Sequence, residues 1–201
     1  MDVAQFLREY QLSPLPNYNK ASLARITQRS PAALRKAAVL IGLIQRESGL
    51  SVILTKRASH LRHHPGQIAF PGGKVEDDDA SLYHTAVREA HEEIGLNPVH
   101  VTLIGQLAPL PTISGYQVTP ILASVNPSAT YVIDRNEVDE VFEVPLDTLL
   151  HQQNLIHLSF MINAQPHPVF ALPFQNHLIW GMTGQIIEAM SRKYCHLLTE
   201  Q

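Results

Sequence analysis

Apolar runs and periodically spaced apolar residues alternate along the chain, and together they predict both strands and helices. Residues 37–44 and 50–55 are apolar runs separated by a polar Glu-Ser-Gly turn, which predicts a β-hairpin. Similar runs predict further strands at 99–107, 117–125, 138–144, 155–162, 167–172 and 178–180. Apolar residues at helical spacing predict helices at 2–11, 145–151 and 183–198. This order of elements fits an α+β fold in which a mixed β-sheet is sandwiched between α-helices.

One more helix is predicted from Asp79 or Ala80 to a stop at Gly95. Aspartates suit the cap and the positive end of the helix dipole, and glycine suits the left-handed residue that commonly ends a helix. At about 100° per residue, one apolar stripe of this helix is expected to be buried. The stripe consists of Tyr83, Val87, Ala90 and Ile94.

Three carboxylates share a second face of this helix, because Glu89, Glu92 and Glu93 are spaced at i, i+3 and i+4. Like charges at this spacing repel one another, so a bound cation would explain their presence. Hard oxygen ligands favour Mg²⁺ or Mn²⁺ over zinc. The ordinary alternative is a solvated acidic face, but the glycine turn before the helix and Arg88 within it favour the metal site.

The glycine turn at Phe70–Gly73 is predicted to interrupt regular structure just before the helix. Gly72 and Gly73 permit backbone conformations closed to other residues and let a ligand approach the main chain closely. A phosphate cradle is therefore predicted here, with an ordinary turn as the alternative.

A basic segment lies upstream of the turn and includes Arg57, Arg62, His63 and His64. Arginine presents a planar fork that matches phosphate oxygens, so this segment is a candidate clamp for a polyanionic substrate. A basic surface loop is the alternative. Zinc is disfavoured because no cysteine lies near these histidines and their spacing fits no common zinc site.

These residues resemble the Nudix hydrolases, whose signature is Gly-x5-Glu-x7-Arg-Glu-U-x-Glu-Glu-x-Gly-U, with U an aliphatic residue. The second half of the signature maps onto residues 88–96, Arg-Glu-Ala-His-Glu-Glu-Ile-Gly-Leu. Counting from Gly73, the acidic position falls on Asp79, and eight residues instead of seven separate it from Arg88. The resemblance implies the Nudix fold and metal-dependent hydrolysis of phosphorus anhydrides.

Residues 54–73 narrow the resemblance, because Leu-Thr-x-x-Arg-Ala, Leu-Arg-x-His, Gly-Gln and Phe-Pro-Gly-Gly resemble the additional motif of the coenzyme A pyrophosphatase branch. That branch also carries a longer acidic loop, which accounts for the extra residue before Arg88. The branch cleaves coenzyme A to 4′-phosphopantetheine and adenosine 3′,5′-bisphosphate. It implies a small-molecule substrate and a possible homodimer.

Roles for individual residues follow as hypotheses. Glu89, Glu92 and Glu93 would hold Mg²⁺ or Mn²⁺, and Arg88 would orient these carboxylates. Glu92, Glu93 or a downstream acid such as Glu140 would accept the proton of the attacking water. Substrate contacts are expected from Arg57, Arg62, His64, Gln67, Gly72 and Gly73.

Length and composition limit the domain organisation, the partners and the cellular location that the sequence predicts. The 201 residues are expected to form a single domain, with a helical extension at 1–36 and a catalytic core at 37–198. A net charge of −3 argues against a nucleic-acid partner. The sequence contains no apolar run long enough for a membrane span, no signal-peptide pattern and a single cysteine, so a cytoplasmic protein is expected.

Two other functions remain open from the sequence. A Nudix hydrolase could act on ADP-ribose, dinucleoside polyphosphates or oxidised nucleoside triphosphates, since the signature leaves substrate choice to the loops. A Nudix-fold sensor would bind a nucleotide without cleaving it. The retained acidic residues and the lack of a basic appendage disfavour the sensor.

Overall fold

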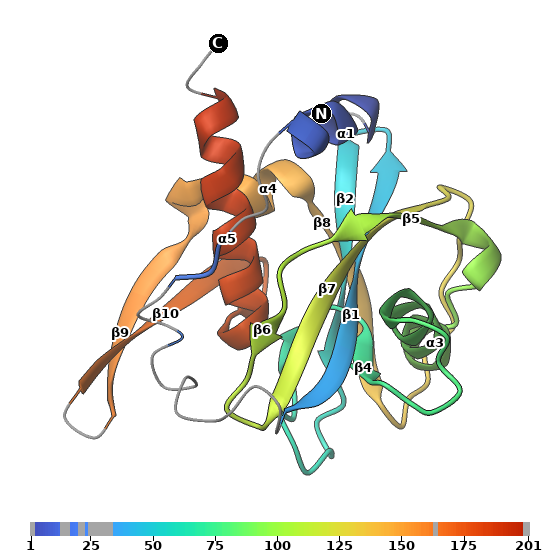
Figure 1. Cartoon of the computed structure of the whole chain (residues 1–201), viewed down its shortest axis with the longest axis horizontal. Helices are drawn as coiled ribbons and strands as arrows, with labels where there is room; N and C mark the ends of the chain where they lie inside the picture. The colour runs from blue at the N-terminus through green and yellow to red at the C-terminus, as the bar shows by residue number, and fades with distance from the viewer. Residues whose placement is uncertain (1–2, 13–16, 20–22, 24–33, 163–164, 199–201) are drawn as a thin grey trace.

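The computed structural model describes residues 3–12, 17–19, 23, 34–162 and 165–198 (Figure 1). Its α-helices are α1 (Val3–Leu12), α3 (Leu82–Ile94), α4 (Leu146–Leu150) and α5 (Gly181–Leu198). Short 3₁₀ helices occur at Pro98–His100 and Gln152–Asn154. No helix in this described part of the chain is both long enough and apolar enough to cross a membrane.

The strands form a main sheet of eight and a second sheet of three. The main sheet contains β1 (Arg35–Arg46), β2 (Gly49–Arg57), β3 (Ile68–Ala69), β4 (Gly72–Lys74), β5 (Val101–Gln106), β6 (Leu110–Pro111), β7 (Tyr116–Val125) and β8 (Val138–Pro145). The second sheet contains β9 (Ile156–Ile162), β10 (Gln165–Phe174) and β11 (His177–Ile179), in the order β11-β10-β9.

Strands β1 and β7 form the centre of the main sheet and run parallel to each other. The predicted hairpin is present, since β2 returns antiparallel to β1, and β8 pairs antiparallel with the outer side of β2. The residues of β1 from Ala37 to Ile44 are all buried, so the strand is covered on both faces. A strand buried on both faces reads as a continuous apolar run, which is the pattern that the sequence shows there.

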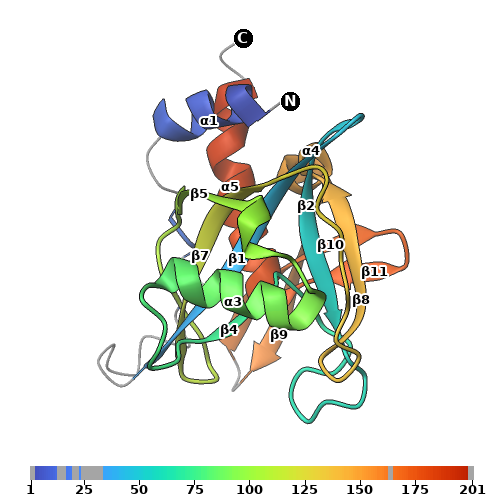
Figure 2. The same cartoon turned by 90° about the vertical axis from the view of Figure 1, so that its right-hand side faces the viewer.

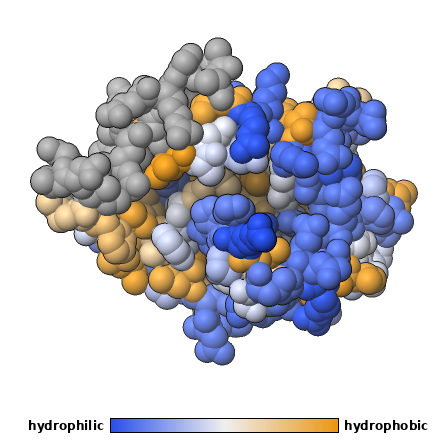
Figure 3. Space-filling view, turned by 90° about the horizontal axis from the view of Figure 1, so that it is seen from below, coloured by the Kyte–Doolittle hydropathy of each residue, from blue (hydrophilic) through white to orange (hydrophobic). Residues whose placement is uncertain are grey.

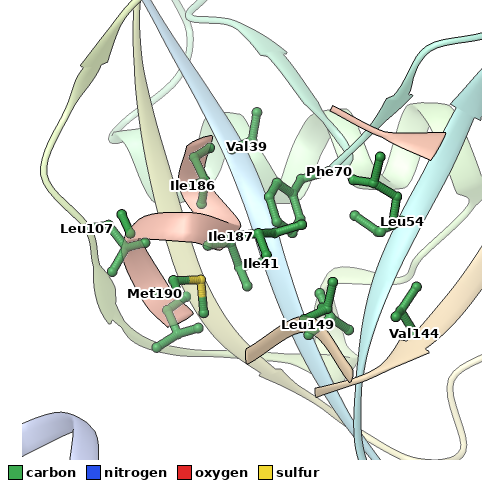
Figure 4. Close-up of a cluster of buried hydrophobic side chains, with 14 of the residues drawn as sticks. Val39, Ile41, Leu54, Phe70, Leu107, Val144, Leu149, Ile186, Ile187 and Met190 are labelled. Carbon is green, nitrogen blue, oxygen red and sulfur yellow. The ribbon is translucent and has the colours of Figure 1, made fainter. Parts of the chain in front are cut away.

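Alternate residues of β1 supply two separate hydrophobic cores, one on each face of the sheet. Val39, Ile41 and Leu43 belong to the core that packs under α4 and α5, part of which is drawn in Figure 4. The core on the other face lies under α3 and contains the intervening β1 residues. Figure 2 shows α3 lying across one face of the sheet, with α5 behind it. The prediction of a mixed sheet between helices is therefore confirmed.

Several details differ from the sequence prediction. Helix α3 begins at Leu82, two to three residues later than expected. The turn predicted at 70–73 contains a short strand, because Gly72 and Gly73 belong to β4 and pair with Ala38 and Val39 of β1. Within the predicted extension at 1–36, α1 is present, and most of the remaining residues lie outside the described part of the chain.

Candidate active site

Helix α3 is held at both ends by local hydrogen bonds. The Ser81 side chain caps its start by accepting from the backbone N–H of His84, at 3.3 Å. Gly95 ends it in the left-handed region, with φ 64°, and donates to His91 O at 2.9 Å. The expectation of an aspartate cap was wrong, because Asp79 turns its carboxylate to Arg88 instead. The caps fix where α3 begins and ends.

Arg88 is the hub of the charged network on α3. Its Nε and Nη2 atoms each donate to Asp79 at 3.0 Å, and Nη2 also donates to Lys74 O at 3.1 Å. Its Nη1 atom donates to Glu92 at 2.9 Å and lies 3.2 Å from a Glu89 oxygen. The guanidinium thus donates four hydrogen bonds to protein acceptors and forms an ion pair with Glu89. Arg88 is built to orient neighbouring carboxylates.

The bond between Arg88 and Asp79 is made across the longer spacing of the signature. Asp79 also accepts from the Thr85 hydroxyl at 2.9 Å and from the Glu76 backbone N–H at 2.9 Å. The hydrogen bonds from Arg88 hold the pKa of the Asp79 carboxyl well below its usual range. The acidic loop is therefore fastened to α3 by a carboxylate that remains ionised.

Asp79→Asn is expected to destabilise the protein by about 2 kcal/mol near neutral pH, because charge-assisted hydrogen bonds to Arg88 are lost. The folded-state pKa of Asp79 is lowered, so the wild-type pair stabilises the protein above the ordinary carboxyl pKa. That stabilisation disappears as the pH falls through the lowered value. Urea unfolding of both proteins near neutral pH and in strong acid measures the difference. The exposed Asp77→Asn serves as control; a gap between wild type and Asp79→Asn that persists in acid would contradict the pairing.

Glu93 is the most buried carboxylate of the site, with the residue only 3% exposed. It accepts from the Gly72 backbone N–H at 3.2 Å, and Arg57 Nη1 lies 3.8 Å from its Oε1 atom. Burial raises the pKa of Glu93 to about 8, although the Gly72 N–H and the charge of Arg57 act in the opposite direction. A buried carboxylate of this kind requires a positive partner in order to ionise at neutral pH.

Glu89 lies beside Glu93 and faces β4. A Cβ atom added to Gly73 would lie 2.5 Å from the Glu89 carboxylate atoms, so any other residue there would require this carboxylate to move. Burial also raises the pKa of Glu89, against the lowering effect of Arg88. The two glycines that were predicted to cradle phosphate thus contact carboxylates in this structure. Their contact with a substrate remains a prediction.

The oxygen atoms present suit a hard cation held partly by the protein. Glu92 differs from its neighbours, since its side chain is 52% exposed and bonds to Arg88. Within the described residues, no three His, Cys, Asp or Glu side chains gather closely enough to form a preformed centre. Magnesium commonly takes only one or two carboxylates and completes its shell with water and phosphate oxygens. The buried pair of Glu89 and Glu93 fits that requirement.

The structure does not bring Glu140 to the α3 carboxylates. Its Oε1 atom lies 3.3 Å from Nε2 of His177, whose ring stacks on Phe142 at 4.3 Å. Phe142 packs against the core on the α5 side of the sheet. A register shift between Lys56 and Arg57 causes this, because Lys56 is paired with Glu140 whereas Arg57 is paired with Val138. Arg57 therefore faces α3, and Glu140 lies on the opposite face.

Glu137 is the downstream acid that lies near α3, and sequence reasoning did not single it out from its neighbours. The segment before it is fastened to the end of α3 by Asp134 N–H donating to Glu93 O at 3.0 Å. Its own carbonyl accepts from Ala58 N–H at 2.8 Å. Burial is the main cause of the raised pKa values of Glu89 and Glu93. The negative charge of Glu137 makes a smaller contribution in the same direction.

The basic segment forms a loop that is closed at its base and open at its tip. Arg57 N–H donates to Gln67 O at 3.0 Å, and Gly66 N–H donates to Arg57 O at 3.1 Å. Arg62 and His64 are exposed on the loop, with His64 in the left-handed region at φ 55°. Of the predicted clamp residues, Arg57 alone contacts an α3 carboxylate within the described part of the chain.

The mixed sheet, the two helical layers and the charged helix α3 define a Nudix fold, and residues 33–163 match the NUDIX domain family. Uncharacterized Nudix hydrolase NudL of Enterobacter sp. (strain 638) is 44% identical over 157 residues, covering 78% of this chain and 81% of the relative. NudL of Escherichia coli O1:K1 / APEC is 39% identical over 187 residues, covering 92% and 91%. The chain belongs to the Nudix hydrolase family.

Among solved structures, the crystal structure of a Nudix hydrolase from M. smegmatis, RenU, is similar at 27% identity and a TM-score of 0.48. The match covers 57% of this chain and 72% of that chain.

Proposed function

We propose that this protein hydrolyses the pyrophosphate bond of coenzyme A and its derivatives, giving 4′-phosphopantetheine and adenosine 3′,5′-bisphosphate. The observation that carries the proposal is the 3.8 Å contact between Arg57 and Glu93. It joins the basic segment that resembles the coenzyme A motif to the most buried carboxylate of α3. A phosphate group held by the segment would therefore lie beside the carboxylates.

The residues of the site would have different roles in the reaction. Glu89 and Glu93 would hold Mg²⁺ or Mn²⁺, with Glu92 as a further ligand. Such a cation supplies charge neutralisation at the phosphates and acidifies a water molecule. Arg88 keeps the carboxylates oriented through its hydrogen bonds to Asp79 and Glu92 and its ion pair with Glu89. Glu137 has a position that suits acceptance of a proton at its carboxylate.

The exposed positions of the loop suit recognition of the rest of the substrate. Arg62 and His64 present donors to solvent next to Arg57, where they can bind the 3′-phosphate of coenzyme A. Gln67 lies at the base of the loop, and its Nε2 atom is close to Gly181 at the start of α5. The base of the loop thus lies next to the start of α5.

Arg62→Ala is expected to lower kcat/KM for coenzyme A about tenfold relative to dephospho-coenzyme A, because one charge-assisted bond to the 3′-phosphate is lost. Steady-state kinetics with both substrates measure the ratio. Arg8→Ala, an exposed arginine on α1 at the opposite end of the molecule (Figure 1), should leave the ratio unchanged. An unchanged ratio in both Arg57→Ala and Arg62→Ala would mean that the 3′-phosphate is bound elsewhere.

Product analysis tests the choice of substrate directly. Coenzyme A, ADP-ribose, a dinucleoside polyphosphate and an oxidised nucleoside triphosphate would be offered separately with Mg²⁺ or Mn²⁺. Mass spectrometry should detect 4′-phosphopantetheine and adenosine 3′,5′-bisphosphate as the products of coenzyme A. Coenzyme A should have the highest kcat/KM of the four substrates. Faster cleavage of ADP-ribose or of a nucleotide would overturn the proposal. Binding without cleavage of any of them would indicate a sensor.

A further inference from the structure

Thr183, near the start of α5, makes a buried hydrogen bond to a segment that lies far away in the sequence. Its hydroxyl donates to Ile68 O at 3.1 Å, and the residue is only 2% exposed. Ile68 is the first residue of β3 and directly follows Gln67 at the base of the loop. The bond therefore joins α5 to the returning end of the loop that the basic segment forms.

The pairing of β3 with β2 directs the Ile68 carbonyl away from β2. Carbonyls of successive strand residues point to opposite sides, and those of Gln67 and Ala69 both accept hydrogen bonds from β2 residues. The Ile68 carbonyl, between them, points to the other side, where the Thr183 hydroxyl meets it. A buried carbonyl that loses its partner costs free energy comparable to a lost hydrogen bond, so this contact helps to decide where β3 lies.

The start of α5 is a firm support for this bond. A Cβ atom added to Gly184 would overlap with the carbonyl oxygen of Phe170, so α5 packs directly on the backbone of β10. At the start of the helix, a Cβ atom added to Gly181 would lie 2.8 Å from Gln67 Nε2. The first turn of α5 thus lies against two consecutive residues at the end of the loop, Gln67 and Ile68.

The next residues along the chain are held by β1. Pro71 O accepts from the Leu40 N–H at 2.7 Å, and Gly72, which donates to Glu93, pairs with β1 as part of β4. The carboxylates of α3 therefore have a support that does not include Thr183. Loss of the Thr183 bond should displace the loop and leave the carboxylates in place.

We propose that Thr183 is a positioning residue for substrate binding, because its hydroxyl fixes β3 and with it the base of the loop. The proposal rests on the function proposed above, which assigns contacts with substrate phosphate to Arg62 and His64 at the exposed tip. In Figure 3, which views the molecule from the end where the loop lies in Figure 1, hydrophilic residues cover a large part of the surface. An exposed tip takes its position from its base, so a displaced β3 would weaken substrate binding.

Thr183→Val removes the hydroxyl and keeps the branched shape of the side chain. We expect the KM for coenzyme A to rise about fivefold, with kcat within about twofold of wild type, since the change affects binding and not the carboxylates. Thr183→Ser retains a donor and should restore a KM close to that of wild type. Met190→Ala is the matched control, since Met190 is buried in the same core further along α5 (Figure 4), and it should lose stability without a change in KM.

Hydrogen–deuterium exchange gives a second measurement that needs no substrate. The Arg57 and Gly66 N–H groups close the base of the loop by donating to Gln67 O and Arg57 O. In Thr183→Val these amides should exchange about fivefold faster than in wild type, while amides in the middle of α3 should be unchanged. If the wild-type protein cleaves another anhydride faster than coenzyme A, the function proposed above fails, and KM is then measured for that substrate.

Four results would overturn the role of Thr183. Either KM or the exchange of the loop amides could match wild type in Thr183→Val. Thr183→Ser could fail to restore them, which would assign the effect to packing of the methyl group. Met190→Ala could raise KM equally, which would indicate a general loss of stability. A fall in kcat with KM unchanged would mean that Thr183 supports the carboxylates instead. If circular dichroism shows that Thr183→Val does not fold, Thr183→Ala takes its place.

Discussion

Glu93→Gln is expected to reduce hydrolysis by about 10³-fold, the largest effect on activity at any single position. Glutamine preserves the shape of the side chain and can still accept the bond from Gly72 N–H. It cannot ionise, so it removes the negative charge that faces Arg57 and the cation in the proposed mechanism. Steady-state kinetics over a range of Mg²⁺ and Mn²⁺ concentrations measure the loss. Glu47→Gln, an exposed residue in the β1–β2 turn, is the matched control.

Measuring the stability of Glu93→Gln distinguishes a loss of catalysis from a loss of folding. Burial raises the pKa of Glu93 to about 8, so the metal-free folded protein favours the protonated carboxyl. Its stability falls as the pH rises from the ordinary carboxyl pKa towards that value. Without metal, Glu93→Gln should therefore be more stable than wild type at pH 8, and the gap should close in mild acid. A folded Glu93→Gln protein with wild-type turnover would refute the role of Glu93.

Gly72→Ala should cause the largest loss of stability, about 3 kcal/mol or more, because this backbone conformation is strained for any other residue. Gly72 has φ +154°, and an added Cβ would lie 2.4 Å from Ala38 O and 2.6 Å from Val39 Cα. Both atoms belong to the backbone of β1 and cannot move without separating β4 from β1. Urea unfolding measures the change in the free energy of unfolding.

Gly66→Ala provides the comparison for Gly72→Ala. Gly66 also has a positive φ, of +67°, but nothing lies within 4 Å of the position where its Cβ would be. Only backbone strain of about 1 kcal/mol is expected there. Equal stability of the two variants would mean that β4 is not held against β1 as closely as the structure indicates. The position of the Gly72 N–H that donates to Glu93 would then be in error as well.

The long elements could be predicted from the sequence because their burial follows a simple period. Strand β1 is covered on both faces and reads as an unbroken apolar run, and α3 buries Val87, Ala90 and Ile94 as its spacing indicates. Strands β3 and β6 have two residues each, too few to show any period. Strand β4 was not predicted, because its two glycines are typical of a turn.

The site was predictable where it lies on a single element. The spacing on α3 pointed to Glu89 and Glu93, which both contact β4, and counting from Gly73 pointed to Asp79. Glu92 is instead half-exposed and bonded to Arg88. Glu140 lies on the face away from α3, because the bulge in the pairing of β2 with β8 decides which acid faces the helix. A one-residue shift between strands depends on long-range pairing, and no local pattern in residues 136–140 records it.

The closed base of the loop from Ala58 to Gln67 has a practical consequence. Two backbone hydrogen bonds between Arg57, Gly66 and Gln67 hold its ends together, and they do not depend on the side chains at its tip. The tip can therefore be exchanged for other sequences while the carboxylates of α3 stay in place. If the tip binds substrate as proposed, exchanging it should alter specificity and leave the α3 carboxylates in place.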